Sequence, residues 1–161
     1  CEPAIFSDTP QMDISILCLD SDFVELTPIV MNWTTSASTT DEEGRLYIPY
    51  SGTVETGVQL VLNVNRTLTE FTIYHRTPDG NSASTDIEAS LVAGDVITLN
   101  AVVGAKSLTL LRAGTVSSLL YAKSPQSGWI ELVKGDNYIR VYAIGAAIPY
   151  TVTYTTRHGG L

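Results

Sequence analysis

The side chains that could perform acid–base or metal chemistry are few in this chain and stand far apart. The sequence contains two histidines, His75 next to Arg76 and His158 near its C-terminal end. Neither is spaced from a cysteine or a carboxylate as zinc ligands are, so both are expected to be hydrogen-bonded surface histidines. Nucleophile-elbow, metalloprotease and phosphate-loop motifs are absent from the sequence. The sequence therefore predicts no catalytic, cofactor-binding or metal-ligating residue, no cofactor, and no enzymatic turnover.

One cluster of carboxylates, formed by Asp41, Glu42 and Glu43, lies in a polar stretch of the chain. We expect these side chains to be solvated. Catalytic carboxylates can also converge in space from distant strands, as they do in glycosidases. Hydrolysis therefore stays open as an alternative that the sequence does not favour.

The charge of the chain bears on its partners. The formal net charge is −8, and the sequence has three lysines. A protein that binds nucleic acid needs clustered Lys and Arg to neutralise phosphates, and the sequence shows no such cluster. Apolar runs also fall short of the roughly 20 residues that cross a bilayer as a helix. We expect neither nucleic acid nor a membrane as a partner.

Aromatic side chains are spread through the sequence and allow two interpretations. An exposed Trp or Tyr ring can stack on a sugar, because it offers a flat apolar face with a polar rim. The interpretation that we favour places these rings in a core or a subunit interface. The residues concerned are Trp33, Trp129, Tyr47, Tyr50, Tyr74, Tyr121, Tyr138, Tyr142, Tyr150 and Tyr154.

The two cysteines do not define a disulfide scaffold. Cys18 lies in an apolar stretch and is expected to pack as a small hydrophobic residue, while a bridge to Cys1 stays open. Cys1 itself permits a bacterial lipoprotein with a lipid on this residue. We favour instead a boundary that happens to fall at this position.

The elements that must position these side chains are strands. The chain has 20 Thr, 14 Val and 12 Ile, whose branched side chains suit a pleated surface, and no segment has helical periodicity. Turn residues punctuate the chain at intervals of roughly 8–12 residues, which indicates an antiparallel sandwich or barrel. The strands are expected at 12–19, 45–50, 54–65, 69–76, 85–91, 95–100, 107–111, 115–121, 129–133, 138–143 and 150–156.

The stretch from Gly128 onward carries the clearest pattern. Two alternating strands flank a turn at residues 134–137, and a third strand runs towards the C-terminal end, where we expect it to be locked into a sheet. Alternation in the first strand places Ile130 and Leu132 on one face and Trp129 and Glu131 on the other. We expect the first pair in the core and Trp129 to be half covered.

An ordered set of motifs resembles one protein family. "W-I-E-L" from Trp129, the following "G-D-N-x-I-R", and "I-P-Y-T-V-T-Y" from Ile148 are similar to the C-terminal end of siphophage tail components of the distal tail protein type. "L-x-x-G-D-x-I-T" from Leu91 matches a hairpin of that family. Residues 14–23 resemble its inter-domain junction, "C-P-D-P-Y-F", although Leu19, Ser21 and Asp22 replace two prolines and a tyrosine.

The resemblance implies an all-β chain: an antiparallel β-sandwich of jelly-roll or galectin-like type at 45–161, preceded by a short strand-containing segment. Residues 1–23 would be the end of an upstream ring-forming domain or an irregular N-terminal segment, and residues 24–44 a linker. The family forms a ring, a hexamer, at the distal end of the tail. Partners would be other phage tail proteins, namely the tail tube, the tail hub, and fibre or receptor-binding proteins.

The implied function is therefore structural: a virion component of the phage tail tip, assembled in the host cytoplasm, that joins tube to tip or baseplate and offers a docking surface. The main alternative is a carbohydrate-binding sandwich that recognises host surface glycans. A concave aromatic cluster surrounded by Asn, Asp and Arg would favour glycans. A flat apolar patch ringed by charge would favour docking.

Overall fold

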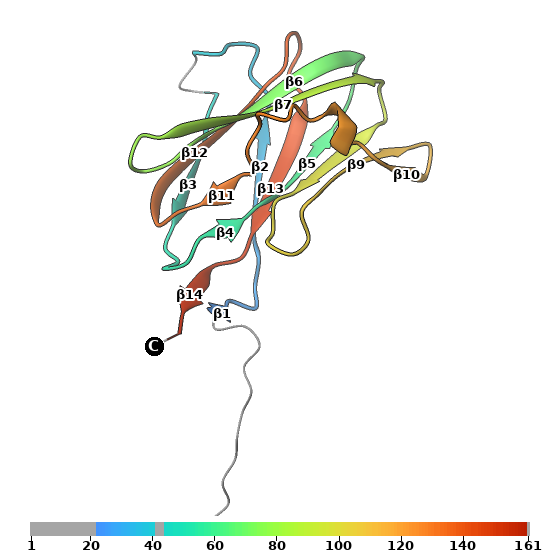
Figure 1. The fold of residues 1–161 in the computed structure, drawn as a ribbon. Coiled ribbons are helices and arrows are strands. Elements are labelled where there is room, and N and C mark those ends of the chain that lie inside the picture. The colour runs from blue at the N-terminus through green and yellow to red at the C-terminus, as the bar shows by residue number, and fades with distance from the viewer. Residues whose placement is uncertain (1–21, 41–43, 161) are drawn as a thin grey trace, which may run out of the picture.

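The computed structural model describes residues 22–40 and 44–160. These residues form an all-β fold in two layers (Figure 1), with one short 3-10 turn, η1 (Leu120–Ala122), in the described part. The ladders between strands are all antiparallel among these residues, which confirms the predicted class of fold. No helix among them is long and apolar enough to cross a membrane.

In the described residues the larger layer is a six-stranded sheet. Its strands lie in the spatial order β10 (Thr115–Ser118), β9 (Ser107–Arg112), β8 (Val96–Asn100), β5 (Gln59–Asn63), β13 (Pro149–Tyr154) and β2 (Ile29–Thr34). Hairpins join β8 to β9 and β9 to β10 at the predicted turns around Gly104 and Gly114. β2 and β10 are the two outer strands.

The facing layer is a four-stranded sheet, in the order β3 (Leu46–Tyr50), β12 (Gly135–Tyr142), β6 (Leu68–Arg76) and β7 (Ser82–Leu91). Two short pairs complete the described strands. β1 (Asp22–Val24) pairs with β14 (Arg157–Gly159), and β4 (Thr56–Gly57) pairs with β11 (Glu131–Leu132).

Alternating apolar residues build the core between the layers. Successive side chains of a strand point to opposite faces, so β3, with its buried–exposed–buried pattern, sends Leu46, Ile48 and Tyr50 inward. The same alternation holds in β5, β8 and β13. Fully buried core residues include Ile48, Leu60, Leu62, Phe71, Ile73, Ile87, Ile97, Leu99, Leu108, Ile139, Val141 and Val152.

The motif that starts at Leu91 led us to expect a hairpin, but the turn at Ala93–Gly94 does not close one. It carries the chain from β7 in one sheet to β8 in the other. Gly94 has a φ of +93°, which costs glycine little. The Asp95 carboxylate accepts hydrogen bonds from the Val92 amide at 2.8 Å and from Arg112 at 2.6 and 2.9 Å. The Arg112 guanidinium holds the pKa of Asp95 below its usual value.

Residues 24–44, which we expected to be a linker, contain an outer strand in their described part. Within them, β2 pairs with β13 over the whole of Ile29–Thr34. The connection continues into the fold, because the Thr35 amide donates to the Ile148 carbonyl at 2.9 Å and the Thr35 hydroxyl accepts from the Ile148 amide at 2.9 Å. β2 is an outer strand, and most of its side chains are exposed.

The expected turn at residues 134–137 is also wrong. Gly135 to Asn137 belong to β12, which pairs with β3 and β6, while β11 pairs with β4. Two other strands differ in extent. The predicted strand at 115–121 ends at Ser118 and gives way to η1, and the predicted strand at 150–156 ends at Tyr154, before the separate strand β14 begins at Arg157. In each case the partner strand, and not the local pattern, sets the limit.

Candidate functional site

The two histidines lie apart, and one differs from expectation. His158 on β14 is partly exposed, with its Nε2 3.4 Å from the Glu25 carboxylate. His75 on β6 is 5% exposed, so the predicted surface position is wrong for it. Its Nε2 lies 3.2 Å from Asn137 Oδ1. Within residues 22–40 and 44–160, no group of three or more His, Cys, Asp or Glu is placed to hold a metal ion.

Stability should fall in mild acid because of His75. Burial lowers the pKa of His75 below its ordinary 6.5, so the unfolded chain takes up this proton more readily than the folded protein. The contribution of neutral His75 is therefore complete above about pH 6.5 and is lost as the pH falls below it. Urea titrations at pH 7.5 and 5.5 should show a larger loss for the wild type than for His75→Gln. His158→Gln is the control and should lose as much stability between these pH values as the wild type. An equal loss of stability in all three proteins would contradict the assignment to His75.

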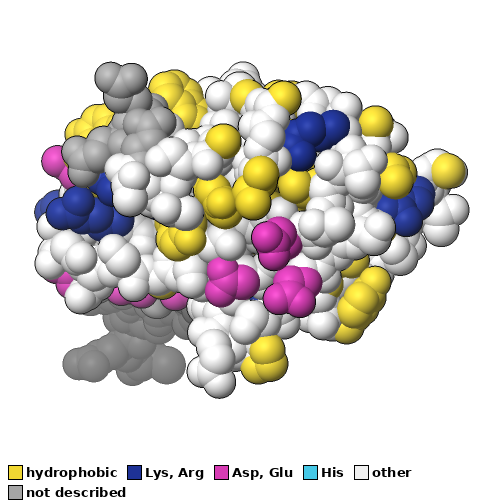
Figure 2. Space-filling view, turned by 90° about the horizontal axis from the view of Figure 1, so that it is seen from above, with side chains coloured by type: hydrophobic (Ala, Val, Ile, Leu, Met, Phe, Trp, Pro, Cys, Tyr) yellow, Lys and Arg dark blue, Asp and Glu magenta, His cyan; other side chains and the backbone are white. Residues whose placement is uncertain are grey.

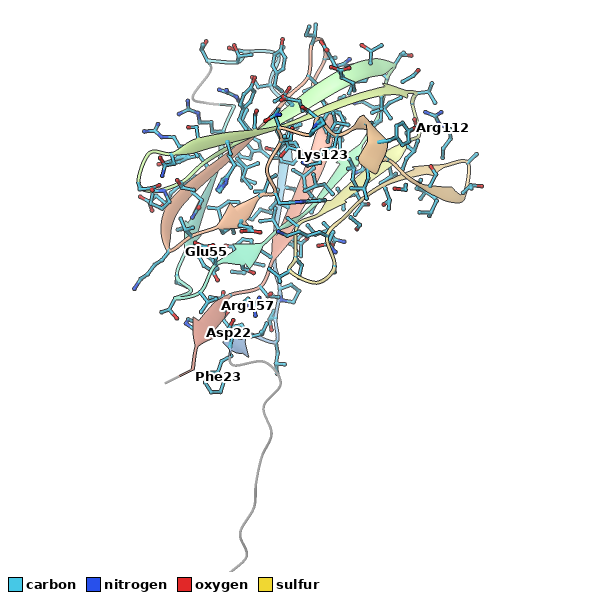
Figure 3. All side chains as sticks on the ribbon, in the orientation of Figure 1. Asp22, Phe23, Glu55, Arg112, Lys123 and Arg157 are labelled. Atoms are coloured by element: carbon cyan, nitrogen blue, oxygen red, sulfur yellow. The ribbon has the colours of Figure 1, made fainter. Side chains whose placement is uncertain are left out.

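The outer strand β2 and the residues before it carry exposed apolar side chains. We call this surface the β1–β2 apolar edge; it consists of Phe23, Val24, Leu26, Ile29, Val30 and Trp33. Leu26 is 100% exposed and Phe23 is 71% exposed, and Figure 3 shows Phe23 at the end of the molecule beside Asp22 and Arg157. The Arg157–Asp22 ion pair, at 2.8 Å, fixes β1 next to β14.

The sheet sizes explain this exposure. Ile29 and Trp33 pair across the ladder with Tyr154 and Tyr150, whose side chains are buried, so both residues point to the inner face of their sheet. The facing sheet has fewer strands in the described part of the chain, and it leaves both side chains 40% exposed. The remaining backbone edge of β2 pairs with no strand among these residues. Such an edge is open to a further strand.

A second surface lies on the outer face of the four-stranded sheet. Tyr and Arg occur two positions apart in three strand segments, so that both side chains of each segment share one face. The register then sets Tyr138 opposite Arg76, and Arg140 opposite Tyr74. We call this surface the arginine–tyrosine pocket; it consists of Arg45, Tyr47, Tyr74, Arg76, Tyr138 and Arg140.

Rings and guanidinium groups in this pocket are in contact. The Tyr47 and Tyr138 ring centroids are 5.5 Å apart, and the Arg140 guanidinium lies 4.8 Å from the Tyr74 ring centroid. The Tyr47 hydroxyl donates to Asp136 at 2.8 Å, and this hydrogen bond raises the pKa of Tyr47. Two adjoining cavities, of about 360 and 80 Å³, share Arg45, Arg76 and Tyr138 in their walls.

The charge of this sheet is divided. Asp86, Glu70 and Glu88 lie on β6 and β7, where Glu70 pairs with Glu88 across the ladder. Figure 2, seen from above the β6–β7 hairpin of Figure 1, shows a group of acidic side chains near the middle of this side, with basic side chains set apart from it. The sheet thus carries carboxylates on one part and guanidinium groups on another.

Trp129 occupies the position predicted for it. Ile130 and Leu132 are buried, and Trp129 is half-buried against the core, as expected from the alternation. The ammonium groups of Lys106 and Lys123 lie 5.9 and 5.3 Å from its ring centroid. These lysines crowd the ring, which makes Trp129 a poor sugar platform.

The remaining aromatic residues divide between core and surface. Tyr50, Tyr150 and Tyr154 are buried, which fits the interpretation that we favoured, whereas Tyr121 on η1 is exposed. Sequence reasoning missed the arginine–tyrosine pocket, although its signal was present as Arg45-x-Tyr, Tyr74-x-Arg and Tyr138-x-Arg. Predictions about Cys1, Cys18 and the cluster at residues 41–43 fall outside the described residues.

Comparison with known proteins places the chain in a family. Residues 51–158 match the family model described as siphovirus-type tail component, C-terminal domain. This match covers well over half of the sequence, and the chain belongs to that family. A search of curated proteins gave no match.

One solved structure agrees with the fold. The crystal structure of Dit from phage SPP1, described as a paradigm of the hub adsorption apparatus in phages that infect Gram-positive bacteria, superposes with a TM-score of 0.66 at 14% identity. The match covers 87% of this chain and 50% of that one, so this chain spans about half the length of SPP1 Dit. The phage P2 baseplate in its activated conformation with Ca matches 72% of this chain and 36% of its own, with a TM-score of 0.48 and 13% identity.

Proposed function

We propose that this siphovirus-type tail component is the outward β-sandwich of a ring at the tail tip, where it joins the tail tube to the tip or baseplate. Its partners are other tail proteins, and the ring is hexameric by family resemblance. It works by binding, without turnover. The family match over residues 51–158 supports the tail component itself. The docking role within the tail tip goes beyond this family match and is our proposal.

The β1–β2 apolar edge is the observation that carries the docking role. It combines an open backbone edge with exposed apolar side chains, and Ile29 and Trp33 point inward without being covered. The occupant that fits is a segment of another tail protein that extends the sheet at β2 and covers these two side chains. Strand addition would satisfy backbone groups and bury apolar surface together. An isolated exposed apolar side chain is common on protein surfaces and would not indicate a partner, whereas this edge gathers several of them.

Two substitutions on this edge should remove the chain from assembled tails. Leu26→Asp and Val30→Asp place a charge on the proposed contact but bury none in the free chain, since both side chains are exposed. Each variant should therefore fold with a Tm within a few degrees of the wild type. Each should be depleted from purified phage tails, as measured by quantitative mass spectrometry.

Val103→Asp is the matched control, because Val103 is 64% exposed and lies in the turn between β8 and β9. It should enter tails at the wild-type level. If Leu26→Asp and Val30→Asp also enter tails at that level, the edge is not the docking surface.

A second candidate function, binding of host surface glycans, is favoured by the arginine–tyrosine pocket. It gathers the Tyr74 and Tyr138 rings, guanidinium groups and the Asp136 carboxylate around two adjoining cavities. This combination is the one expected of a glycan site. The two functions use different surfaces of the sandwich and are compatible with each other.

A further inference from the structure

We propose that the arginine–tyrosine pocket binds an acidic saccharide, a sugar unit that carries a phosphate or a carboxylate group. The inference rests on the second candidate function and names its ligand class. The docking role at the β1–β2 apolar edge does not depend on it.

The charge of the pocket points to an anion. The chain has six arginines, all within the described ranges, and Arg45, Arg76 and Arg140 line these two adjoining cavities. Among the described residues, three guanidinium groups and one carboxylate, that of Asp136, lie in their walls. Half of the six arginines of a protein with a net charge of −8 therefore lie around these cavities. Guanidinium groups bind phosphate and carboxylate through paired hydrogen bonds.

Two of the guanidinium groups differ in how they are held. Arg140 is 6% exposed and lies over the Tyr74 ring, so its position is largely fixed before a ligand arrives. Arg76 ends β6 and is exposed, and its guanidinium group makes no hydrogen bond or ion pair with the described residues. We assign Arg76 the direct contact with the anionic group, and Arg140 a preset positive charge behind it.

The tyrosine rings point to a sugar. Tyr138 lines both cavities, and the Tyr47 ring adjoins it with its plane tilted by 42°, so a pyranose ring can stack on one of these rings while its hydroxyls remain hydrogen-bonded. The Tyr47 hydroxyl and Asp136 supply a polar boundary within reach of sugar hydroxyls. The larger cavity, at about 360 Å³, has the size of a small-ligand site.

The surroundings disfavour a long polyanion. Glu70, Asp86 and Glu88 lie on the same sheet, along the strands that lead away from the pocket. A nucleic acid or an anionic membrane would have to cross these carboxylates and would be repelled. A single charged sugar unit contacts only the positive part of the face.

Titration by two-dimensional ¹H–¹⁵N NMR tests the inference on the whole 161-residue chain. The probes are glucose 6-phosphate, glucuronic acid, neutral glucose and inorganic phosphate. We expect the two acidic sugars to shift amides around Arg76 and Tyr138, with a Kd of about 1 mM or tighter. Glucose and inorganic phosphate should each bind at least about tenfold more weakly, because each lacks one half of the recognition. Added salt should weaken the binding of the two acidic sugars, because it screens the attraction between opposite charges.

Two variants and a control locate the binding. Arg76→Gln and Tyr138→Ala should each raise the Kd for glucose 6-phosphate at least about fivefold. Both variants should keep the amide spectrum of a folded chain. Lys106→Gln removes an equal charge outside the pocket, beside Trp129 and Glu131, and should bind as the wild type does. An equal loss in all three variants would overturn the inference, since it would report net charge alone.

The other outcomes separate this inference from the functions that it builds on. Equal binding of glucose and glucose 6-phosphate in the pocket would overturn the acidic ligand and keep the glycan function. An absence of shifts in the pocket with every sugar would overturn both. Neither result touches the docking role, which Leu26→Asp and Val30→Asp test in assembled tails.

Discussion

Ile130→Ala should lower the free energy of unfolding by about 2–4 kcal/mol. Ile130 is 2% exposed and belongs to the core cluster, so its truncation removes apolar contacts and leaves a cavity. The segment around it can relax little, because the Val58 amide donates to the Ile130 carbonyl at 3.3 Å and β11 follows at once. Urea denaturation followed by circular dichroism measures the loss.

Trp129→Ala supplies the comparison on the other face of the same segment. Trp129 is larger but only half-buried, with its ring beside Lys106 and Lys123. Its truncation should therefore cost less than that of Ile130 in the isolated chain. A greater loss for Trp129→Ala would show that the two faces contribute in the reverse order.

Asn137→Ala should cost about 2–4 kcal/mol as well, through hydrogen bonds and not through packing. Asn137 is fully buried, and its Nδ2 donates to the carbonyls of Val133 at 2.7 Å and Gly135 at 3.0 Å. Its Oδ1 accepts from the Val133 amide at 3.2 Å and contacts His75. The truncation leaves several buried polar groups without partners, and the bend between β11 and β12 loses its support.

Asn63→Ala is the matched control, because Asn63 ends β5 and is exposed. It should change stability by no more than about 0.5 kcal/mol. Amide hydrogen exchange gives a second readout: protection at Val133 should fall in Asn137→Ala and stay unchanged in Asn63→Ala. A loss for Asn137→Ala as small as that of the control would contradict the bracing role.

Much of the strand content could be predicted because strands and turns have local sequence patterns. β-Branched residues, period-two alternation and Gly-containing turns located β3, β6, β8, β9 and β12 to within a few residues. Alternation also predicted the inward direction of Ile130 and Leu132, since it depends on the backbone pleat alone. The ordered motifs from Leu91 to Tyr154 were sufficient to suggest the family.

Strand pairing was not predictable in the same way. The residues at 134–137 have the composition of a hairpin turn, yet they enter β12 because Asn137 satisfies the bend with its own side chain and β3 and β6 supply the backbone partners. Likewise, we expected residues 24–44 to be a linker, but residues 29–34 form β2, which pairs with β13 along its whole length. Both outcomes depend on partners more than 50 residues away in the sequence.

The sequence by itself determined the class of fold, the faces of most strands and the family, because these follow from local alternation and from motif order. The tertiary structure alone decided which surfaces are available. Ile29 and Trp33 are exposed because the facing sheet falls short of β2, and His75 is buried because β6 turns it inward. Arg76 meets Tyr138, and Arg140 meets Tyr74, only through the antiparallel register of β6 and β12. Register is a long-range property, fixed when the whole core packs, and no local pattern encodes it.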